Sequence, residues 1–432
     1  MNNRRNFIKK STALAGILPF LGMTNSAEAG EFEFQDNYLN SPAGNDEDFW
    51  AWVRDSFSLS TNIINLNNGG VSPQPKVVQE AHIRNYQLSN EAPTYYMWRI
   101  LDQGREPLRR KLADLLGAKP DEIAINRNCT EGLNSIVFGM KLQPGDEVVL
   151  SLYDYPNIIN AWKQREKRDG IKLNWVDIKF PAENEDEVVA AFGKSITDKT
   201  KVVYITHVIN WTGQILPVRK IANLAHSKGC EVIVDGAHSF AHLDYKIADL
   251  DCDYYATSLH KWLCAPFGTG MMYIKKDKIA KIWPLLSNDN PESEDIHKFE
   301  SLGTRSFAAE MAIGAAIDFH LAIGIKRKQE RLFFLKNYWA TKAAQIPKVS
   351  LNTSLKPEFS GALCNFSIEG WTATEIESKL FEKYKIHTSP VIWGKVNGAR
   401  VTPHVYTTTR ELDVLVNAIE DLAAMVPPEK KK

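Results

Sequence analysis

The chain has 432 residues, with 52 basic and 52 acidic side chains and an apolar content of 44 %. This length and composition permit a large buried core, in two domains or in one large α/β domain with a smaller appendage. A net charge of zero gives no reason to expect nucleic acid or an anionic membrane surface as a partner. The five cysteines show no tight pairing pattern, so we predict no disulfide framework, and we predict no metal site.

Residues 1–29 have the features of a secretion signal. A basic stretch precedes a mildly apolar run from Thr12 to Met23, and Ala27-Glu28-Ala29 then supplies a small-x-small cleavage pattern. The apolar run is too short and too rich in glycine and hydroxyl residues for a membrane span, so we expect no stable membrane anchor. Residues 3–9 resemble the twin-arginine signal, which implies export of an already folded protein to the periplasm. An ordinary basic N-terminus would explain only the first of these features.

Residues 30–62 are predicted to form an arm, extended and polar over 30–50, and alternating helix and strand signals begin near residue 100. Leucines at helical spacing predict a helix over 105–116, closed by Gly117. Compact apolar runs predict buried strands over 147–150, 202–206 and 232–234. A helix is predicted over 218–228, between the second and third of these strands. This βαβ rhythm predicts a parallel sheet covered by helices.

The pattern changes after residue 323. A long charged helix over 324–344, short strands and a closing helix over 411–425 predict a smaller C-terminal domain, 324–432, after a large domain, 63–323. Two glycine-containing runs, 193–195 and 268–270, lack the full pattern of a phosphate-binding loop or a dinucleotide fingerprint, which disfavours a nucleotide-binding enzyme.

The residues that indicate chemistry are Asp235 and Lys261. Asp235 ends a predicted buried strand, where α/β sheets place ligand-binding groups. A buried lysine loses its proton readily and forms imines, and a buried aspartate keeps a pyridinium nitrogen protonated. Taken singly, Asp235 would be interpreted as a helix cap and Lys261 as a surface charge. Together with their flanking residues they favour a pyridoxal 5′-phosphate (PLP) site.

At this point the sequence resembles the class V aminotransferases of PLP fold type I. The motifs are Asp235-Gly236-Ala237-His238 and Ser258-Leu259-His260-Lys261, followed by a Gly-Thr-Gly run, and the resemblance runs from about residue 63 to 425. It implies an α/β fold with a mostly parallel, seven-stranded-type sheet in the large domain and a smaller α+β C-terminal domain. It also implies PLP held as a Schiff base on Lys261, with Asp235 as the partner of the pyridine nitrogen.

The same resemblance assigns the remaining site residues. His238 and Asn210 would lie near the phenolic oxygen, Tyr155 would stack on the cofactor ring, and Arg400 would clamp the substrate carboxylate. Thr304 would reach the phosphate from a neighbouring subunit, which implies a homodimer with shared active sites. For Tyr155 the alternative is a core tyrosine, and for Arg400 a surface arginine.

The phosphate would be bound by Ser258, His260 and the start of a helix that follows a short strand. Cys129-Thr130-Glu131-Gly132 opens that helix, and a helix amino terminus offers free N–H groups and a partial positive charge to a phosphate. Thr130 would add a hydroxyl, while Cys129 is expected to contribute only its backbone. The alternative is that Thr130 is a plain helix cap.

The reaction is less defined than the cofactor. Residues 388–394 contain no cysteine where desulfurases of the class carry their nucleophile, which disfavours sulfur transfer. Residues 67–70, 303–305 and 400–404 look most like the isopenicillin N epimerase-related branch. We predict transamination of an amino acid or peptidic amine, with epimerisation as the alternative, because no acid for the opposite face is evident. A non-catalytic PLP-fold binding protein is the alternative from another class.

Overall fold

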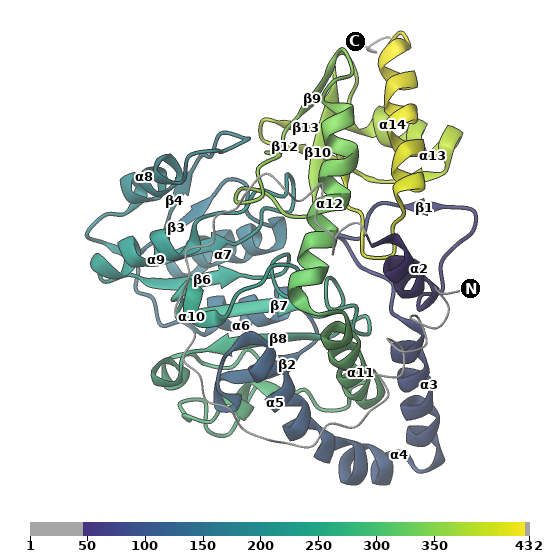
Figure 1. Cartoon of the computed structure of the whole chain (residues 1–432). Helices are drawn as coiled ribbons and strands as arrows, with labels where there is room; N and C mark the ends of the chain where they lie inside the picture. The colour runs from purple at the N-terminus through teal and green to yellow at the C-terminus, as the bar shows by residue number, and fades with distance from the viewer. Residues whose placement is uncertain (1–45, 428–432) are drawn as a thin grey trace, which may run out of the picture. The chain divides into compact units, whose positions relative to one another are not determined.

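The computed structural model describes residues 46–427, which belong to one compact unit of the chain. A seven-stranded sheet has the strand order β2-β8-β7-β6-β5-β3-β4 (Figure 1). Its strands are β2 (Ile123–Asn126), β3 (Glu147–Ser151), β4 (Lys172–Val176), β5 (Thr200–Thr206), β6 (Glu231–Asp235), β7 (Tyr254–Ser258) and β8 (Gly270–Ile274). All neighbours are parallel except β8, which is antiparallel to both β2 and β7. The predicted α/β fold with a mostly parallel sheet is confirmed.

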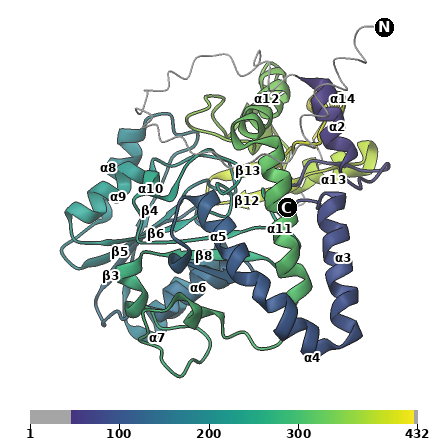
Figure 2. The same cartoon turned by 60° about the horizontal axis from the view of Figure 1, so that its bottom comes forward.

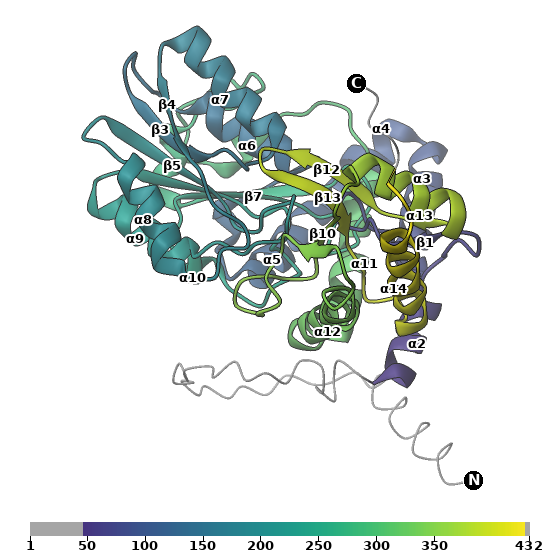
Figure 3. The ribbon, with the colours of Figure 1, turned by 90° about the horizontal axis from the view of Figure 1, so that it is seen from above.

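Helices cover both faces of this sheet, because its strands carry apolar residues on both sides (Figure 3). In β6, Val232 and Val234 join one core and Ile233 joins the other. The first core is closed by α5 (Arg105–Leu116), α8 (Glu185–Ser195), α9 (Val218–Ser227) and α10 (Ile247–Leu250). The second is closed by α6 (Cys129–Gly139) and α7 (Pro156–Asp169).

A second, four-stranded antiparallel sheet has the order β12-β13-β10-β9. Its strands are β9 (Val349–Leu351), β10 (Cys364–Ile368), β12 (Ser389–Trp393) and β13 (Val396–Val401). It packs with α12 (Ile325–Ala343), α13 (Ala373–Tyr384) and α14 (Thr409–Ala424) around a third core. The early strand β1 (Ile64–Asn65) pairs with β11 (Ile386–His387). The segment before residue 70 is therefore hydrogen-bonded to the later part of the chain.

Further helices come from the early part of the chain and from α11. The long helix α3 (Lys76–Glu91) runs beside α11 (Phe307–Ile323), as Figure 2 shows, and α2 (Glu47–Asp55) precedes both in the chain. Three short segments join α3 to α5: α4 (Pro93–Tyr95), η2 (Tyr96–Leu101) and η3 (Asp102–Gly104). Within the described residues no single helix is long and apolar enough to cross a membrane, although α11 and α12 pass that test as a pair bent by 77°.

Most predicted elements appear within one or two residues of their predicted bounds. The helix over 105–116 ends at Gly117 in the left-handed conformation, which only a glycine adopts without strain. The arm expected to be extended over 30–50 is helical from Glu47 onward, because Asp46 caps the helix by accepting from Phe49 N–H at 3.2 Å. The predicted signal, 1–29, lies outside the described residues, and the domain boundary at 323/324 stays a prediction.

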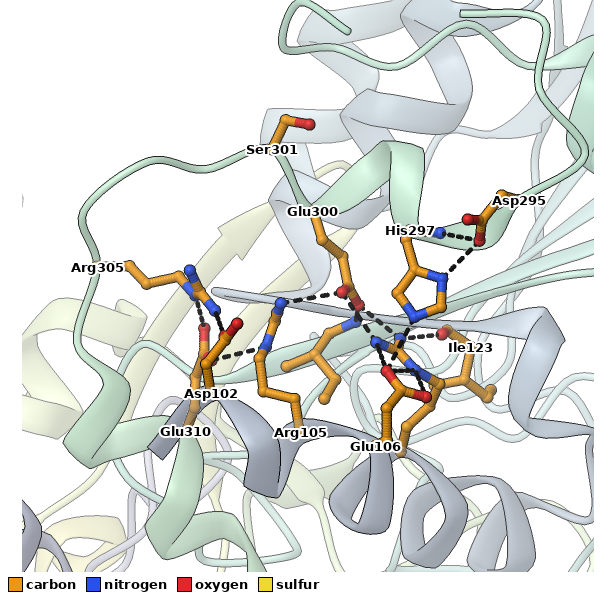
Figure 4. Close-up of polar contacts among 12 residues, drawn as sticks. Asp102, Arg105, Glu106, Ile123, Asp295, His297, Glu300, Ser301, Arg305 and Glu310 are labelled. Atoms are coloured by element: carbon orange, nitrogen blue, oxygen red, sulfur yellow. Dashed lines mark hydrogen bonds and ion pairs between the residues drawn. The ribbon is translucent and has the colours of Figure 1, made fainter. Parts of the chain in front are cut away.

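A cluster of buried charges closes the free edge of the sheet at β2 (Figure 4). The carboxylate of Glu300 accepts from Ile125 N–H at 2.6 Å, and Arg109 donates to the carbonyl of Ile123 at 2.6 Å. Glu300 and Arg109 also bond each other at 2.6 and 2.9 Å. The ion pair therefore satisfies backbone groups that a further strand would otherwise bond.

The same cluster anchors the exposed segment 301–304 on both sides. Before the segment, Glu300 of η6 (Ile296–Glu300) is also paired with Arg105 at 3.0 Å. After it, Arg305 donates to Glu310 at 2.7 Å and to Asp102 at 2.8 Å, as Figure 4 shows. Buried charges at both ends hold a short solvent-exposed loop between them.

We predict that Glu300→Gln destabilises the fold by about 3–5 kcal/mol, because it leaves two buried arginines without their shared counter-charge. Asp318→Asn is the matched control, since Asp318 of α11 pairs with Lys111 of α5 at the surface. That substitution should cost less than about 1 kcal/mol. Urea unfolding of the two variants measures the difference, and equal unfolding midpoints would contradict a structural role for the buried cluster.

Candidate active site

Asp235 lies at the carboxyl end of the central strand β6 and is 4 % exposed. Its Oδ1 accepts hydrogen bonds from Ala237 N–H at 2.9 Å and from the thiol of Cys129 at 3.3 Å. Its Oδ2 accepts from the phenol of Tyr204 at 3.1 Å. Three donors thus offset the cost of removing this carboxylate from water.

Lys261 follows the neighbouring strand β7, in a turn, and its Nζ lies 3.2 Å from Nε2 of His238. Burial lowers the pKa of Lys261 and the charge of Asp235 opposes this effect, with a net downward shift. Burial, reinforced by the charge of Lys261, holds the pKa of His238 well below its usual range, so the imidazole is neutral at neutral pH. An amine that sheds its proton readily serves as both nucleophile and base.

Backbone contacts fix the turn that carries Lys261. Ser72 N–H donates to the carbonyl of His260 at 3.1 Å, and the buried Lys328 of α12 donates to the carbonyl of Trp262. The ring of Trp262 stacks on that of His242, with centroids 4.1 Å apart. The residues on both sides of Lys261 are therefore held by other parts of the chain, which restricts the lysine stem.

The amino terminus of α6 lies against the end of β7. Cys129 N–H donates to Oγ of Ser258 at 3.0 Å, and Thr130 lies half-buried in the first turn. The close approach requires glycine at position 132, where a Cβ would lie 2.9 Å from that of Ala256. Hydroxyls beside a helix amino terminus form an anion site, as the sequence predicts for the phosphate.

The thiol of Cys129 lies at Asp235, and the expected role of the Cys129 backbone at the phosphate stays a prediction. Its N–H is engaged by Ser258, and its thiol points to Asp235, on the other side of the helix start. His260, the other predicted phosphate ligand, has its Nδ1 at 3.1 Å from the carbonyl of Thr269. That contact leaves Nε2 as the ring nitrogen available to a ligand.

Arg400 is 7 % exposed on β13, yet in the part of the chain that the structure describes no carboxylate pairs with it. Nη1 donates to the carbonyl of Asn210 and Nη2 to Oδ1 of Asn67, both at 2.9 Å, while Nε has no partner. Burial lowers the pKa of Arg400 to about 10. A buried guanidinium held by neutral oxygens is suited to bind an anion that enters the site.

Two further predicted residues lie at the same end of the sheet. Asn210 follows β5, and its buried Oδ1 has no hydrogen-bond partner in the described residues. Tyr155 precedes α7 and is 39 % exposed, and its charge acts to raise the pKa of Arg400 against the effect of burial. Its exposure favours contact with a ligand over the alternative of a core tyrosine.

Thr304 is not brought together with the other candidates. It is exposed within the anchored segment 301–304, and among the described residues no hydrogen bond joins it to another predicted site residue. The structure thus gathers ten of the eleven predicted residues at the carboxyl ends of the parallel strands and on β13, and presents the eleventh on an exposed loop.

Sequence reasoning missed three residues of this region. Tyr204 contacts Asp235, Asn67 contacts Arg400, and the buried Asp154 accepts from the hydroxyl of Thr206 at 2.7 Å. Burial raises the pKa of Asp154 to about 8. The sequence does contain a signal for Tyr204, because it is a polar aromatic residue inside an apolar strand. It lies two positions before the end of that strand, and so on the same face as the last residue.

The residues present fit PLP. The site supplies a buried carboxylate that can accept from a pyridine nitrogen, an amine of lowered pKa, and a hydroxyl at a helix amino terminus. Buried polar atoms without partners remain at the site, as expected for groups that bond a ligand: Oδ1 of Asn210, Nδ1 of His238, Nε of Arg400 and Oγ1 of Thr402.

Comparisons with known proteins agree with this fit. The isopenicillin N epimerase of Amycolatopsis lactamdurans is 28 % identical over 395 residues, which cover 87 % of this chain and 98 % of that protein. A probable cysteine desulfurase of Synechocystis sp. is 27 % identical over 402 residues, 86 % and 94 % of the two chains. A solved cysteine desulfurase of Escherichia coli has the same fold, with a TM-score of 0.76 at 24 % identity over 87 % of this chain and 98 % of that one.

The family comparison covers most of the chain. The sequence profile of the class-V aminotransferases matches residues 64–410, from β1 to the start of α14, and so includes every residue of the site described above. The enzymes of this family use PLP, and the geometry around Asp235 and Lys261 is that of a PLP site. The chain therefore belongs to the class-V aminotransferase family of PLP-dependent enzymes.

Proposed function

We propose that this PLP-dependent enzyme exchanges the α-proton of an amino acid or peptidic amine and inverts the configuration of that carbon. The observation that carries the proposal is the buried guanidinium of Arg400, which has no carboxylate partner among the described residues and lies at the same end of the sheet as Lys261. A substrate carboxylate would supply the missing counter-charge and orient the adjacent α-carbon.

Each residue has a defined task in this proposal. Lys261 would hold the cofactor as a Schiff base and, once displaced by the substrate amine, remove the α-proton, a role that an amine of lowered pKa suits. Asp235 would accept the hydrogen bond of the ring nitrogen, and the start of α6 would bind the phosphate. When bound, PLP supplies an electron sink for the electron pair left at the α-carbon.

Sulfur transfer is disfavoured, although several relatives are called cysteine desulfurases. All five cysteines lie in the described part of the chain, and all five are buried. Burial raises the pKa of each thiol above its usual range, so none is a ready thiolate. The choice is therefore between reactions that move only the α-proton or the amino group.

Epimerisation needs a second group on the face opposite the lysine, and we assign this role to Tyr155. Tyr155 is 39 % exposed, and its charge would raise the pKa of Arg400. Two relatives are called isopenicillin N epimerase, at 28 % and 26 % identity, which also supports this outcome. Transamination, which the sequence favours, is the second candidate, because it needs a single base and Lys261 beside a neutral His238 supplies one.

We also propose a homodimer and export to the periplasm. The dimer is supported by the exposed Thr304, which buried ion pairs hold in place although it contacts no other site residue of its own chain. The export proposal rests on residues 1–29, outside the described part of the chain. A cofactor linked covalently before export would remain with a protein that crosses the membrane folded.

We predict that the protein loaded with PLP shows a visible absorption band that Lys261→Ala lacks. Hydride reduction of the wild-type protein should attach the cofactor to the peptide that contains Lys261, as mass spectrometry of a digest can establish. A wild-type protein that shows no band after addition of PLP would refute the central claim. A band without any spectral response to amines would identify a binding protein instead.

We predict that Thr130→Val weakens PLP binding about tenfold or more, because a hydrogen bond to a charged group contributes about 1.5–3 kcal/mol. Fluorescence titration of the protein with PLP measures the affinity. Ser135→Ala, one turn further along α6, is the control, since its hydroxyl donates only to the carbonyl of Glu131. Equal affinities in the two variants would place the phosphate elsewhere.

The reaction type is decided in deuterated water, with free amino acids and short peptides as probes. We expect deuterium at the α-carbon together with inverted configuration, detected by mass spectrometry and chiral chromatography. A keto acid in place of inverted product would establish transamination.

We predict that Tyr155→Phe reduces inversion at least about 100-fold but leaves deuterium exchange without inversion, because one face keeps its base. Tyr153→Phe, in the same segment but buried, is the control; inversion at the wild-type rate in Tyr155→Phe would exclude Tyr155.

A further inference from the structure

Tyr204 is the residue that most directly controls Asp235 without being able to touch a substrate. It is fully buried in the middle of the sheet, on β5, and its hydroxyl donates to Oδ2 of Asp235 at 3.1 Å. In the parallel pair of β5 with β6, Thr206 is the residue aligned with Asp235, so Tyr204 reaches forward along the sheet to make this contact. Asp235 is the hydrogen-bond partner that the structure gives this phenol.

The direction of this hydrogen bond is fixed by the chemistry of the groups around it. Burial and the nearby charge of Asp235 raise the pKa of Tyr204 well above its usual range, so the phenol keeps its proton. Burial does the same for the thiol of Cys129, which approaches Oδ1 of the same carboxylate. Asp235 therefore accepts from both side chains and from the backbone of Ala237, and donates to none of them.

We propose that Tyr204 is a positioning residue that sets, through Asp235, how the proton between Asp235 and the ring nitrogen of the cofactor is shared. This inference rests on the proposed role of Asp235 at that nitrogen. Each hydrogen bond donated to a carboxylate withdraws negative charge from its oxygens and weakens it as a proton acceptor. With Tyr204 in place, the proton stays on the ring nitrogen. Without the phenol, Asp235 would draw the proton toward itself, and the ring would lose positive charge.

The chain offers a matched control, a second buried phenol that bonds a carboxylate of β6. Tyr254 of β7 is also fully buried, and its hydroxyl donates to Glu231 at 2.8 Å, at the amino end of β6. Tyr204 and Tyr254 thus make the same type of bond to carboxylates at opposite ends of one strand. Removal of either hydroxyl removes one buried phenol–carboxylate bond, but only Tyr204 acts on the carboxylate at the site.

The test uses PLP labelled with ¹⁵N in the ring, bound to the full-length protein, with the nitrogen chemical shift as the readout. We expect the wild type to show a protonated ring nitrogen. In Tyr204→Phe the shift should move toward the value of unprotonated pyridine, and in Tyr254→Phe it should not move. A merely structural role would affect both variants alike. An unchanged nitrogen shift in folded Tyr204→Phe would overturn the inference.

A second variant covers the case in which Tyr204→Phe does not fold. Cys129→Ala removes the other side-chain donor of Asp235, so the nitrogen shift should move in the same direction by a smaller amount, since a thiol is the weaker donor. An unchanged nitrogen shift in Cys129→Ala, with Tyr204→Phe unfolded, would also count against the inference.

The outcomes distinguish this inference from the proposed function. A wild-type protein that forms no visible band refutes the proposed function. A wild type with a band and a protonated nitrogen, but no response to loss of these donors, refutes only the role of Tyr204.

Discussion

The carboxylate of Asp235, buried at the carboxyl end of β6, is the constraint on which the rest of the site depends. A negative charge enclosed between two cores is costly unless hydrogen bonds satisfy it, and here one strand, one turn and one helix start contribute donors. Tyr204 comes from β5, Cys129 from the start of α6, and Ala237 from the turn after β6. Lys261, in the turn after the neighbouring strand β7, is influenced by this charge, which raises its pKa against the effect of burial.

Arg400 is the second buried charge, and its environment is the reverse of that around Asp235. Neutral oxygens of Asn210 and Asn67 hold the guanidinium in place without neutralising it. Leaving such a charge unpaired reduces stability, and proteins accept this loss where a site must bind an anion. The large sheet therefore supplies the negative charge and the second sheet, through β13, supplies the positive charge. A substrate that carries both an amine and a carboxylate matches this separation.

At the edge of the large sheet, buried charges pair with one another. At the edge strand β2, the Arg109–Glu300 pair satisfies backbone groups of Ile123 and Ile125 that no further strand bonds. The strand they stabilise leads directly to the start of α6, where the phosphate is expected. Arg400 differs from Arg109, because only neutral oxygens among the described residues hold it and because it lies at the same end of the sheet as Lys261. This location is the reason to regard Arg400 as functional rather than structural.

The sequence by itself determined the βαβ order, most helix bounds, the pairing of Asp235 with Lys261 as the functional core, and the helix start at Cys129. These follow from local patterns: apolar periodicity, glycine at helix ends, and short motifs within a few residues of one another. Only the tertiary structure decided which donors surround Asp235 and that the thiol of Cys129 points to this carboxylate. It likewise decided that Asn67 bonds Arg400, which lies 333 residues away in the sequence. It also decided that residues 47–50 are helical and that Thr304 stands apart on its own chain. Such contacts depend on how strands align and which way side chains turn, and local sequence patterns do not encode distances between segments that meet only when the chain folds.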